Sequence, residues 1–546
     1  MVINMGFSGL VKKTKEFMVP RRLIWLLGFG ALAAAFVTTN AACSQKDDDE
    51  TITPVEWKTP GKTFSNYDQR KWLSANNTYI AAEKINGTAI DLQYSPTATA
   101  VPVTVASDSL ENRFVAFTGD ENYIVFEKRD AGDTYRTLFV WDIAAGAAFQ
   151  ATPSSGRFEF KDFDDLATEF CYRDIDTGQK FIHTLGTTFT QNTEFTGSEI
   201  EEYAYDKNSN GEFLIILSRD MGGGKHDLLL KDPQDNSEVN VTNTPTIDEK
   251  FIFEFRKLTG NGEPLDQGTW LVLQEVTSGN YRVIEINPRD LEIMHVYADG
   301  TQDCSIPNDP EGVPLVSESE QFVVISQDFG ATDKQIFLYD RSDHSLTKVS
   351  DGVGAIFEAN LVADSGNVIM RKYYNGNVWN IVRYWRHGGY VSLVTNDVDK
   401  NNYGVAMSPE DGGEFFAFVR EDEFGGFNKE LVAARTQNVH DRQTVSTKYI
   451  SGPTQGVPFG ARFIHVVANG KKILVFSEEV TPGGDVEVKA YDHETKATPA
   501  NVTNDSNMKD HAFQRSGDKR RIIIKSEGTS SEKMKVYDGV STTDYQ

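Results

Sequence analysis

The sequence of 546 residues has only three cysteines, Cys43, Cys171 and Cys304. This number excludes a disulfide-rich scaffold, and no pair has CxxC or Cys/His spacing, so no zinc site is predicted. The nine histidines are scattered and never stand as HxH. The motifs HExxH and GxSxG and a Gly-rich phosphate loop between strand and helix are also absent. We therefore predict no catalytic residues, no cofactor and no enzyme activity of these classes.

Positive charge is scarce as well. Lysine and arginine number 54 against 80 aspartates and glutamates, and the net charge is −26. Residues 1–42 carry +4, which leaves −30 on the rest of the chain. A body this acidic repels a phosphate backbone, so nucleic acid is excluded as the main partner. The charge suits solubility, cationic partners or bound cations.

The N-terminus resembles an address signal. Two arginines precede an apolar run from Leu23 to Val37, which is shorter than the roughly 20 residues that span a bilayer. The run is followed by Ala41-Ala42-Cys43, which resembles the lipobox of bacterial lipoproteins, although Asn40 stands where that motif has Leu. The resemblance implies that residues 1–42 are a signal peptide and that Cys43 carries the lipid. Simple secretory cleavage is the alternative.

The residues after this cysteine are acidic around one lysine; they are Lys46, Asp47, Asp48, Asp49 and Glu50. The pattern is similar to the surface-export signal of Bacteroidetes lipoproteins, and a plain solvated spacer is the alternative. Residues 43–64 then form an extended, Pro-containing tether. The resemblance implies a lipid-anchored protein of the outer membrane, exposed at the cell surface.

The rest of the chain, residues 65–546, repeats. Ten segments resemble one another and recur at intervals of about 44 to 58 residues. They are Thr88–Leu92, Thr137–Asp142, Lys180–Thr184, Asp227–Asp232, Tyr281–Asn287, Gln335–Asp340, Trp379–Trp385, Glu430–Ala434, Glu487–Asp492 and Lys533–Asp538. A second marker ends the last strand of four units, at Val241-Thr-Asn243, Val349-Ser-Asp351, Val394-Thr-Asn396 and Val502-Thr-Asn504. Short β-branched and aromatic runs between polar turns predict four strands per unit.

A period in the forties with four strands per unit predicts an all-β fold, a β-propeller of eight or more four-stranded blades. We name the strands of a unit A to D. The predicted A–B turns resemble the S-x-D-G turn of the TolB-like (PD40, WD40-like) propellers; they are Thr118-Gly-Asp120, Asp364-Ser-Gly366, Ser408–Gly413 and Ser516-Gly-Asp518. About ten units suggest one wide ring, with two adjoining rings as the alternative. The first and last units look incomplete, so we expect strands from both termini to close one blade.

Two other features are candidate sites. Asp206, Asn208 and Asn210 match the first half of a Ca²⁺ loop, but Leu217 stands where such a loop needs Glu, and an A–B hairpin is the stronger interpretation. The predicted B–C loops suggest an acidic and aromatic rim around the mouth of the channel; they are Lys128–Gly132, Arg219–His226, Gln327–Gly330 and Glu421–Phe427. Loops on a rigid scaffold often bind ligands, although a turn by itself needs Asp and Gly.

The segment from Arg371 to Tyr390 is a basic and aromatic island in an acidic body. The residues predicted to bind a ligand are Arg371, Tyr373, Trp379, Arg383 and Trp385. Rings beside guanidinium groups suit sugars or planar anions. Packing between two blades is the alternative.

These features favour a surface lipoprotein whose propeller binds a ligand, small molecule or glycan, or a partner such as a TonB-dependent outer-membrane transporter. Other Bacteroidetes propeller lipoproteins suggest this role by analogy of fold and address alone. The alternatives are a propeller-based polysaccharide lyase or glycosidase, which needs paired carboxylates, and a structural scaffold in an envelope complex. TolB-like peptidases need a second, hydrolase domain, and no such pattern follows the repeats.

Overall fold

The computed structural model divides the chain into two compact parts, Met1–Pro54 and Val55–Gln546, and all the residues that it describes belong to the second. The described residues are 73–545, apart from 87–88, 100, 108, 131–135, 155, 164–168, 178–179, 188–192, 196–199, 208–212, 232–236, 245, 258–263, 278, 289–290, 299, 310–313, 331, 351–354, 375–377, 398, 409–412, 423–428, 439, 449–460, 467–469, 481–484, 504–508, 516–519 and 528–531. In this range no helix is long and apolar enough to cross a bilayer.

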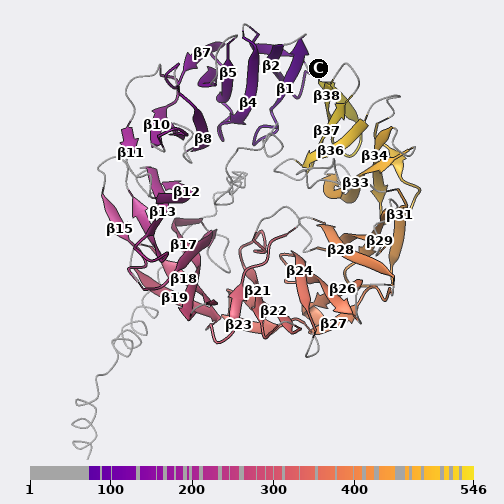
Figure 1. The fold of residues 1–546 in the computed structure, drawn as a ribbon. Coiled ribbons are helices and arrows are strands. Elements are labelled where there is room, and N and C mark those ends of the chain that lie inside the picture. The colour runs from indigo at the N-terminus through magenta and orange to yellow at the C-terminus, as the bar shows by residue number, and fades with distance from the viewer. Residues whose placement is uncertain are drawn as a thin grey trace, which may run out of the picture. The chain divides into compact units, whose positions relative to one another are not determined.

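The described residues form ten antiparallel blades in chain order (Figure 1). The strands of the first five are β1 (Tyr79–Asn86), β2 (Ala89–Pro96) and β3 (Val103–Ala106); β4 (Glu111–Phe117), β5 (Tyr123–Arg129), β6 (Thr137–Asp142) and β7 (Ala147–Gln150); β8 (Phe158–Phe163), β9 (Glu169–Asp174), β10 (Lys180–Thr184) and β11 (Thr193–Phe195); β12 (Ile200–Lys207), β13 (Phe213–Asp220), β14 (His226–Lys231) and β15 (Glu238–Asn240); β16 (Glu249–Lys257), β17 (Pro264–Thr277), β18 (Asn280–Asn287) and β19 (Glu292–Ala298).

The strands of blades 6 to 10 are β20 (Asp303–Ser305), β21 (Phe322–Asp328), β22 (Lys334–Asp340) and β23 (Ser345–Lys348); β24 (Phe357–Val362), β25 (Val368–Tyr374), β26 (Val378–Trp385) and β27 (Tyr390–Leu393); β28 (Lys400–Met407), β29 (Phe415–Asp422), β30 (Lys429–Arg435) and β31 (Arg442–Ser446); β32 (Ala461–Val466), β33 (Lys471–Glu479), β34 (Val486–Asp492) and β35 (Ala500–Asn501); β36 (Lys509–Arg515), β37 (Ile522–Glu527), β38 (Glu532–Tyr537) and β39 (Thr542–Tyr545). One short 3₁₀ turn, η2 (Arg386–Gly388), joins β26 to β27.

The predicted β-propeller is confirmed, and each of the ten repeat segments coincides with the C strand of one blade. The expectation of a closing blade built from both termini is wrong. Blade 10 has four strands of its own, and in blade 1 an isolated bridge between Leu73 and Ile80 takes the innermost place beside β1 to β3. Each terminal segment of the described chain therefore completes its own blade.

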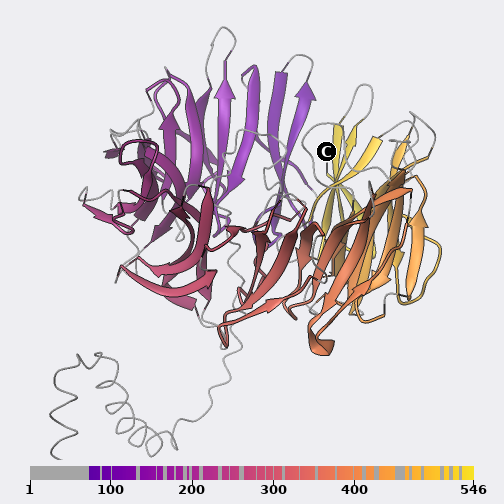
Figure 2. The same ribbon diagram turned by 60° about the horizontal axis from the view of Figure 1, so that its bottom comes forward.

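Hydrophobic packing between blades closes one ring. Ile523 and Val536 of blade 10 share a buried cluster with Ile80 and Leu92 of blade 1. Arg521 Nη1 also donates to the carbonyl oxygen of Asn77, in the turn before β1 of blade 1, at 3.1 Å. The same kind of cluster joins most other neighbours along the chain. The described blades thus make a single ring rather than two, and Figure 2 shows their strands side by side with the turns gathered at the two faces.

A hydroxyl at the end of the D strand holds five blades in register. In each, a Thr or Ser hydroxyl oxygen accepts a hydrogen bond of 2.9 or 3.0 Å from a backbone N–H of the C strand. The pairs are Thr152 with Leu138, Thr242 with Leu228, Ser350 with Ile336, Thr395 with Ile381 and Thr503 with Val488. This bond satisfies a buried amide that the short D strand leaves without a partner. It is the physical reason for the Val-Thr-Asn marker.

Candidate ligand-binding site on blade 7

The repeated hydroxyl bond gives an internal alignment of five C strands. Two residues after the amide that donates, four blades carry an apolar side chain, and blade 7 carries Arg383. The apolar residues are Val140, Leu230, Leu338 and Ala490. Side chains two apart on a strand point to the same face, so each fills a comparable place between blades. Arg383 therefore occupies a position that is apolar in the four aligned blades.

Blade 7 departs from the repeat again two residues later. Blades 2, 6 and 9 have an aspartate there, and its carboxylate accepts backbone N–H groups of the C–D turn. These residues are Asp142, Asp340 and Asp492. Blade 7 has Trp385 at this place and forms the turn η2 instead, with Gly389 in the left-handed region at φ 63°. The next residue, Arg386, donates from Nη2 to Asp340 Oδ2 of blade 6 at 2.6 Å.

Arg383 is buried, with 2 % of its surface exposed. Its Nε and Nη2 donate to Ser392 Oγ at 3.2 and 2.9 Å, whereas Nη1 has no acceptor. Among the described residues no carboxylate lies within ion-pair distance of this guanidinium. Burial lowers the pKa of Arg383, and the Tyr390 phenol partly offsets the shift.

Aromatic rings surround this buried cation. The Cζ atom of Arg383 lies 5.9 Å from the ring centroid of Trp385 and 5.7 Å from that of Tyr390. These two rings meet edge to face at 5.4 Å. A side chain at Gly388 would collide with both of them, so glycine is needed for their approach. The Trp385 indole Nε1 is also buried without an acceptor.

The other predicted residues lie at the opposite end of β26. Arg371 donates to Glu358 Oε2 through Nε at 2.8 Å and through Nη2, and its Cζ lies 4.4 Å from the centroid of the Trp379 ring. The Tyr373 and Trp379 rings are 5.2 Å apart and face each other across the β25–β26 pair. The structure therefore splits the predicted set into two groups. Arg371 already has its carboxylate, and Arg383 does not.

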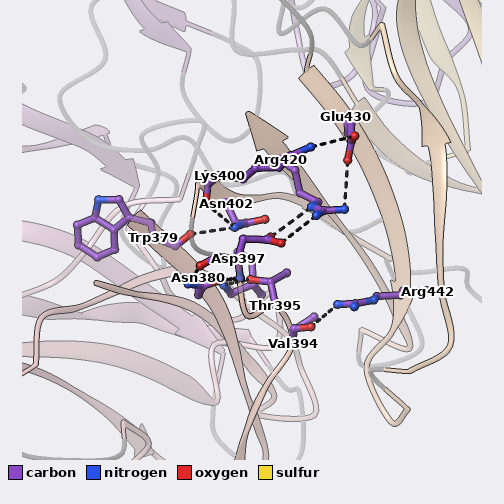
Figure 3. A network of polar contacts seen from close by, with 11 residues as sticks. Trp379, Asn380, Val394, Thr395, Asp397, Lys400, Asn402, Arg420, Glu430 and Arg442 are labelled. Atoms are coloured by element: carbon purple, nitrogen blue, oxygen red, sulfur yellow. Dashed lines mark hydrogen bonds and ion pairs between the residues drawn. The ribbon is translucent and has the colours of Figure 1, made fainter. Parts of the chain in front are cut away.

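A polar network joins the island to blade 8 (Figure 3). Asn380 Oδ1 accepts from the Thr395 hydroxyl at 2.8 Å and from the Asp397 backbone N–H at 2.7 Å. The Asp397 carboxylate in turn accepts from Arg420 Nη2 at 2.9 Å, and Arg420 Nη1 lies 3.1 Å from Glu430. Lys400 also lies 3.1 Å from Glu430, so two cations and two carboxylates pair here, whereas Arg442 donates to the Val394 carbonyl oxygen. This network fixes the two blades to each other and leaves Arg383 outside it.

The B–C turns share a second pattern. In five blades an acidic residue at or near the end of strand B is followed by an apolar side chain that is 39–46 % exposed. The apolar residues are Ile175, Met221, Val276, Phe329 and Val480. Because every blade has the same strand order, these turns emerge on one face of the ring. Of these five turns only those of Met221 and Phe329 were predicted from the sequence as part of a binding rim, although the acidic–apolar dipeptide marks all of them.

A buried ion pair between blades 5 and 6 was not predicted from the sequence. Arg341 Nη2 lies 2.8 Å from Glu285 Oε1, with 6 and 3 % of the two side chains exposed. Burial acts to raise the pKa of Glu285, but the Arg341 guanidinium and hydrogen bonds from Thr269 and Tyr297 outweigh it, so the pKa lies below its ordinary value. Arg341 also lies 3.8 Å from the centroid of the Phe255 ring. No local sequence signal links these two residues, which are 56 positions apart.

A titratable cluster lies at the B–C end of blades 4 and 5. His226 Nδ1 is 2.9 Å from Asp248 Oδ1, and the Tyr281 hydroxyl donates to Asp248 Oδ2 at 3.1 Å. Burial acts to raise the pKa of Asp248, and these two hydrogen bonds outweigh it and lower the pKa. The Lys225 ammonium forms an ion pair with Glu275 across the same junction. The cluster ties neighbouring blades together just below two of the exposed apolar tips.

Other predicted residues lie outside the described part of the chain. These are Cys43, Lys46 to Glu50, Asn208 and Asn210. Asp206 belongs to β12, which forms a hairpin with β13 and pairs there with Leu214, as the hairpin interpretation expects. The described residues contain no group of three or more His, Cys, Asp or Glu that would hold a metal ion.

Comparisons with known proteins give remote likenesses only. No protein-family model and no curated protein matches the chain. Porphyromonas gingivalis dipeptidyl peptidase 4 is 9 % identical with a TM-score of 0.42, over 74 % of this chain and 64 % of that one. Prolyl oligopeptidase B from Galerina marginata is 14 % identical with a TM-score of 0.33, over 65 and 55 %. TolB from Acinetobacter baumannii is 13 % identical with a TM-score of 0.24, over 58 and 78 %.

The chain thus spans less than two thirds of the length of both peptidases. At these identities and TM-scores the likenesses carry no inference about activity.

Proposed function

We propose that the protein is a lipoprotein of the outer membrane, anchored through Cys43 and exposed at the cell surface, whose propeller binds a ligand or partner as an accessory to a TonB-dependent transporter. The lipobox-like segment and the acidic residues after it support this location at the cell surface. The ring is the binding module. A lyase or glycosidase activity and a purely structural role stay predictions.

The observation that carries the partner-binding role is the B–C face of the ring. Four consecutive blades, 3 to 6, and blade 9 each present an exposed apolar side chain directly after a carboxylate. Single exposed apolar residues are normal, but their recurrence at one structural position is not expected from packing. Apolar contacts ringed by negative charge fit a protein partner with basic residues around its own apolar surface.

The experiment uses the full-length protein in its native membrane. Detergent-solubilised outer membranes are passed over the tagged lipoprotein, and transporter recovery is measured by mass spectrometry. We expect a transporter to co-purify, and the double variant Met221→Ser, Phe329→Ser to lower its recovery about tenfold or more, as for loss of two interface hot spots. The matched control is Leu346→Ser, an equally exposed apolar residue on the outer strand β23.

Two results would contradict the proposal. One is an unchanged recovery in the double variant, which removes the B–C face as the docking surface. The other is a Cys43→Ala protein that still fractionates with the outer membrane and still incorporates radiolabelled fatty acid, which removes the lipid anchor.

A further inference from the structure

Two hydrogen-bond donors on blade 7 lack acceptors although both are buried. They are Nη1 of Arg383 and Nε1 of Trp385. Buried polar groups in folded proteins nearly always have partners, and an orphan points to a missing ion, water or ligand. The guanidinium adds a positive charge that no carboxylate in the described part of the chain balances, which is costly in a buried place. A compact anion would satisfy both donors and the charge at once.

From this geometry we propose that Arg383 and Trp385 form a binding site for the carboxylate group of a small-molecule ligand. The two residues are two apart on β26, so their side chains share one face. Ser392 holds the Nε and Nη2 edge of the guanidinium, so the free Nη1 lies on the side away from Ser392. A charge-assisted bond to a carboxylate is the strong contact that this donor offers.

The internal repeat strengthens the assignment. Replacing a buried ion pair by well-packed hydrophobic residues is often neutral or stabilising, and a buried charge without a partner is costlier still. Blade 6 shows that the fold accepts Leu338 at the equivalent position, where it is buried in the core cluster between blades 6 and 7. Packing alone therefore does not explain an arginine at this place.

Tyr390 gives the site its route to solvent. Its ring covers the guanidinium and is 45 % exposed, and it follows the two glycines of the η2 turn. Nothing lies within 4 Å of a Cβ built on Gly389, so the outer side of this turn is open. Rotation of the Tyr390 side chain is therefore the motion that admits the ligand. The tight contact between the two rings leaves no slot for a third, so the site accepts the carboxylate head of a ligand.

This inference deepens the ligand-binding half of the proposed function, and it is tested on the purified full-length protein without membrane or transporter. Its failure is thus separate from failure of the docking proposal. The probe is sodium acetate in chloride-free buffer, and the readout is the NMR signal of the Trp385 indole N–H, assigned by its loss in Trp385→Phe. We expect this signal to shift with half-saturation at about 1–10 mM, a reasonable affinity for so small a ligand.

The key variant is Arg383→Leu, which installs the blade 6 residue and keeps the blade folded. We expect its response to acetate to weaken at least tenfold while its urea midpoint in acetate-free buffer equals or exceeds that of the wild type. The matched control, Arg371→Leu, removes the cation that is already paired and leaves the response intact. An indole signal that ignores acetate, or one that shifts equally in Arg383→Leu, overturns the proposal. If chloride shifts the indole signal as much as acetate does, the site binds simple anions, and the assignment to a carboxylate is overturned.

Discussion

Two of the three buried arginines in the described ring differ in how their charge is balanced. Arg341, between blades 5 and 6, has Glu285 opposite it, and its Nη1 donates to the Glu320 carbonyl oxygen at 2.9 Å. Arg383, on blade 7, has the Ser392 hydroxyl and the neighbouring Tyr390 phenol, and no carboxylate of the described residues is within ion-pair distance. Both lie against aromatic rings. The protein therefore balances one buried charge internally and leaves the other for something outside the chain.

The difference separates architecture from recognition. The first pair joins two blades, since Glu285 comes from β18 and Arg341 follows β22. The unpaired cation lies at a place that four other blades fill with apolar residues, and its hydrogen bonds to Ser392 stay within blade 7. Buried charges with partners inside the protein are expected where the blades must hold together. A buried charge without such a partner is expected where the ring binds a ligand.

The largest effect is expected when Arg341 loses its carboxylate partner and so becomes unpaired, as Arg383 is. We expect Glu285→Gln to lower the free energy of unfolding by about 3 kcal/mol, because it leaves a buried guanidinium without its carboxylate. Urea unfolding at pH 7 measures the loss. The control Glu358→Gln removes the partner of the half-exposed Arg371 and is expected to cost about 1 kcal/mol or less. Equal losses in the two variants would show that burial does not govern these pairs.

A smaller effect is expected at the unpaired arginine. Ser392→Ala removes the acceptor of Nε and Nη2, and we expect it to cost about 1–3 kcal/mol in acetate-free buffer. Thr347→Ala is the matched control, because Thr347 stands opposite Leu338 in blade 6 as Ser392 stands opposite Arg383 in blade 7. It should change the free energy of unfolding by about 0.5 kcal/mol or less. If the serine variant were as stable as the control, the hydroxyl would not be holding the guanidinium.

The ring was predictable from sequence because its signals are local. Strand alternation and the Val-Thr-Asn marker both arise within one blade, so ten C strands could be located without any contact across blades. The charges were not predictable in the same way. Arg371 and Arg383 look alike in the sequence, and only the β24–β25 register, which places Glu358 opposite Arg371, distinguishes them. Pairing of Glu285 with Arg341 depends on how two blades pack, for which no residue spacing gives a rule.

The smallest expected effect is a pH dependence of stability at the Arg341–Glu285 junction. His295 lies on β19 opposite Glu285, and its ring is 3.8 Å from that of His344 on blade 6. Burial lowers the pKa of His295, and the neighbouring imidazole and the Arg341 guanidinium lower it further, while Glu285 opposes them.

A folded-state pKa below the unfolded value of about 6.5 means that the unfolded chain binds the proton first. The contribution to stability is therefore complete above about pH 6.5 and is lost as the pH falls through that value toward the folded pKa. Since His295 is only partly buried, the slope should stay well below the one-proton limit of about 1.4 kcal/mol per pH unit. We expect His295→Gln to reduce the change of the melting temperature with pH between about pH 6.5 and pH 5, relative to wild type. The same change should leave acetate binding at Arg383 untouched, because the paired junction and the open site share no contact among the described residues. A wild-type profile that is already flat over this interval would show that the two imidazoles do not report on the Arg341 junction.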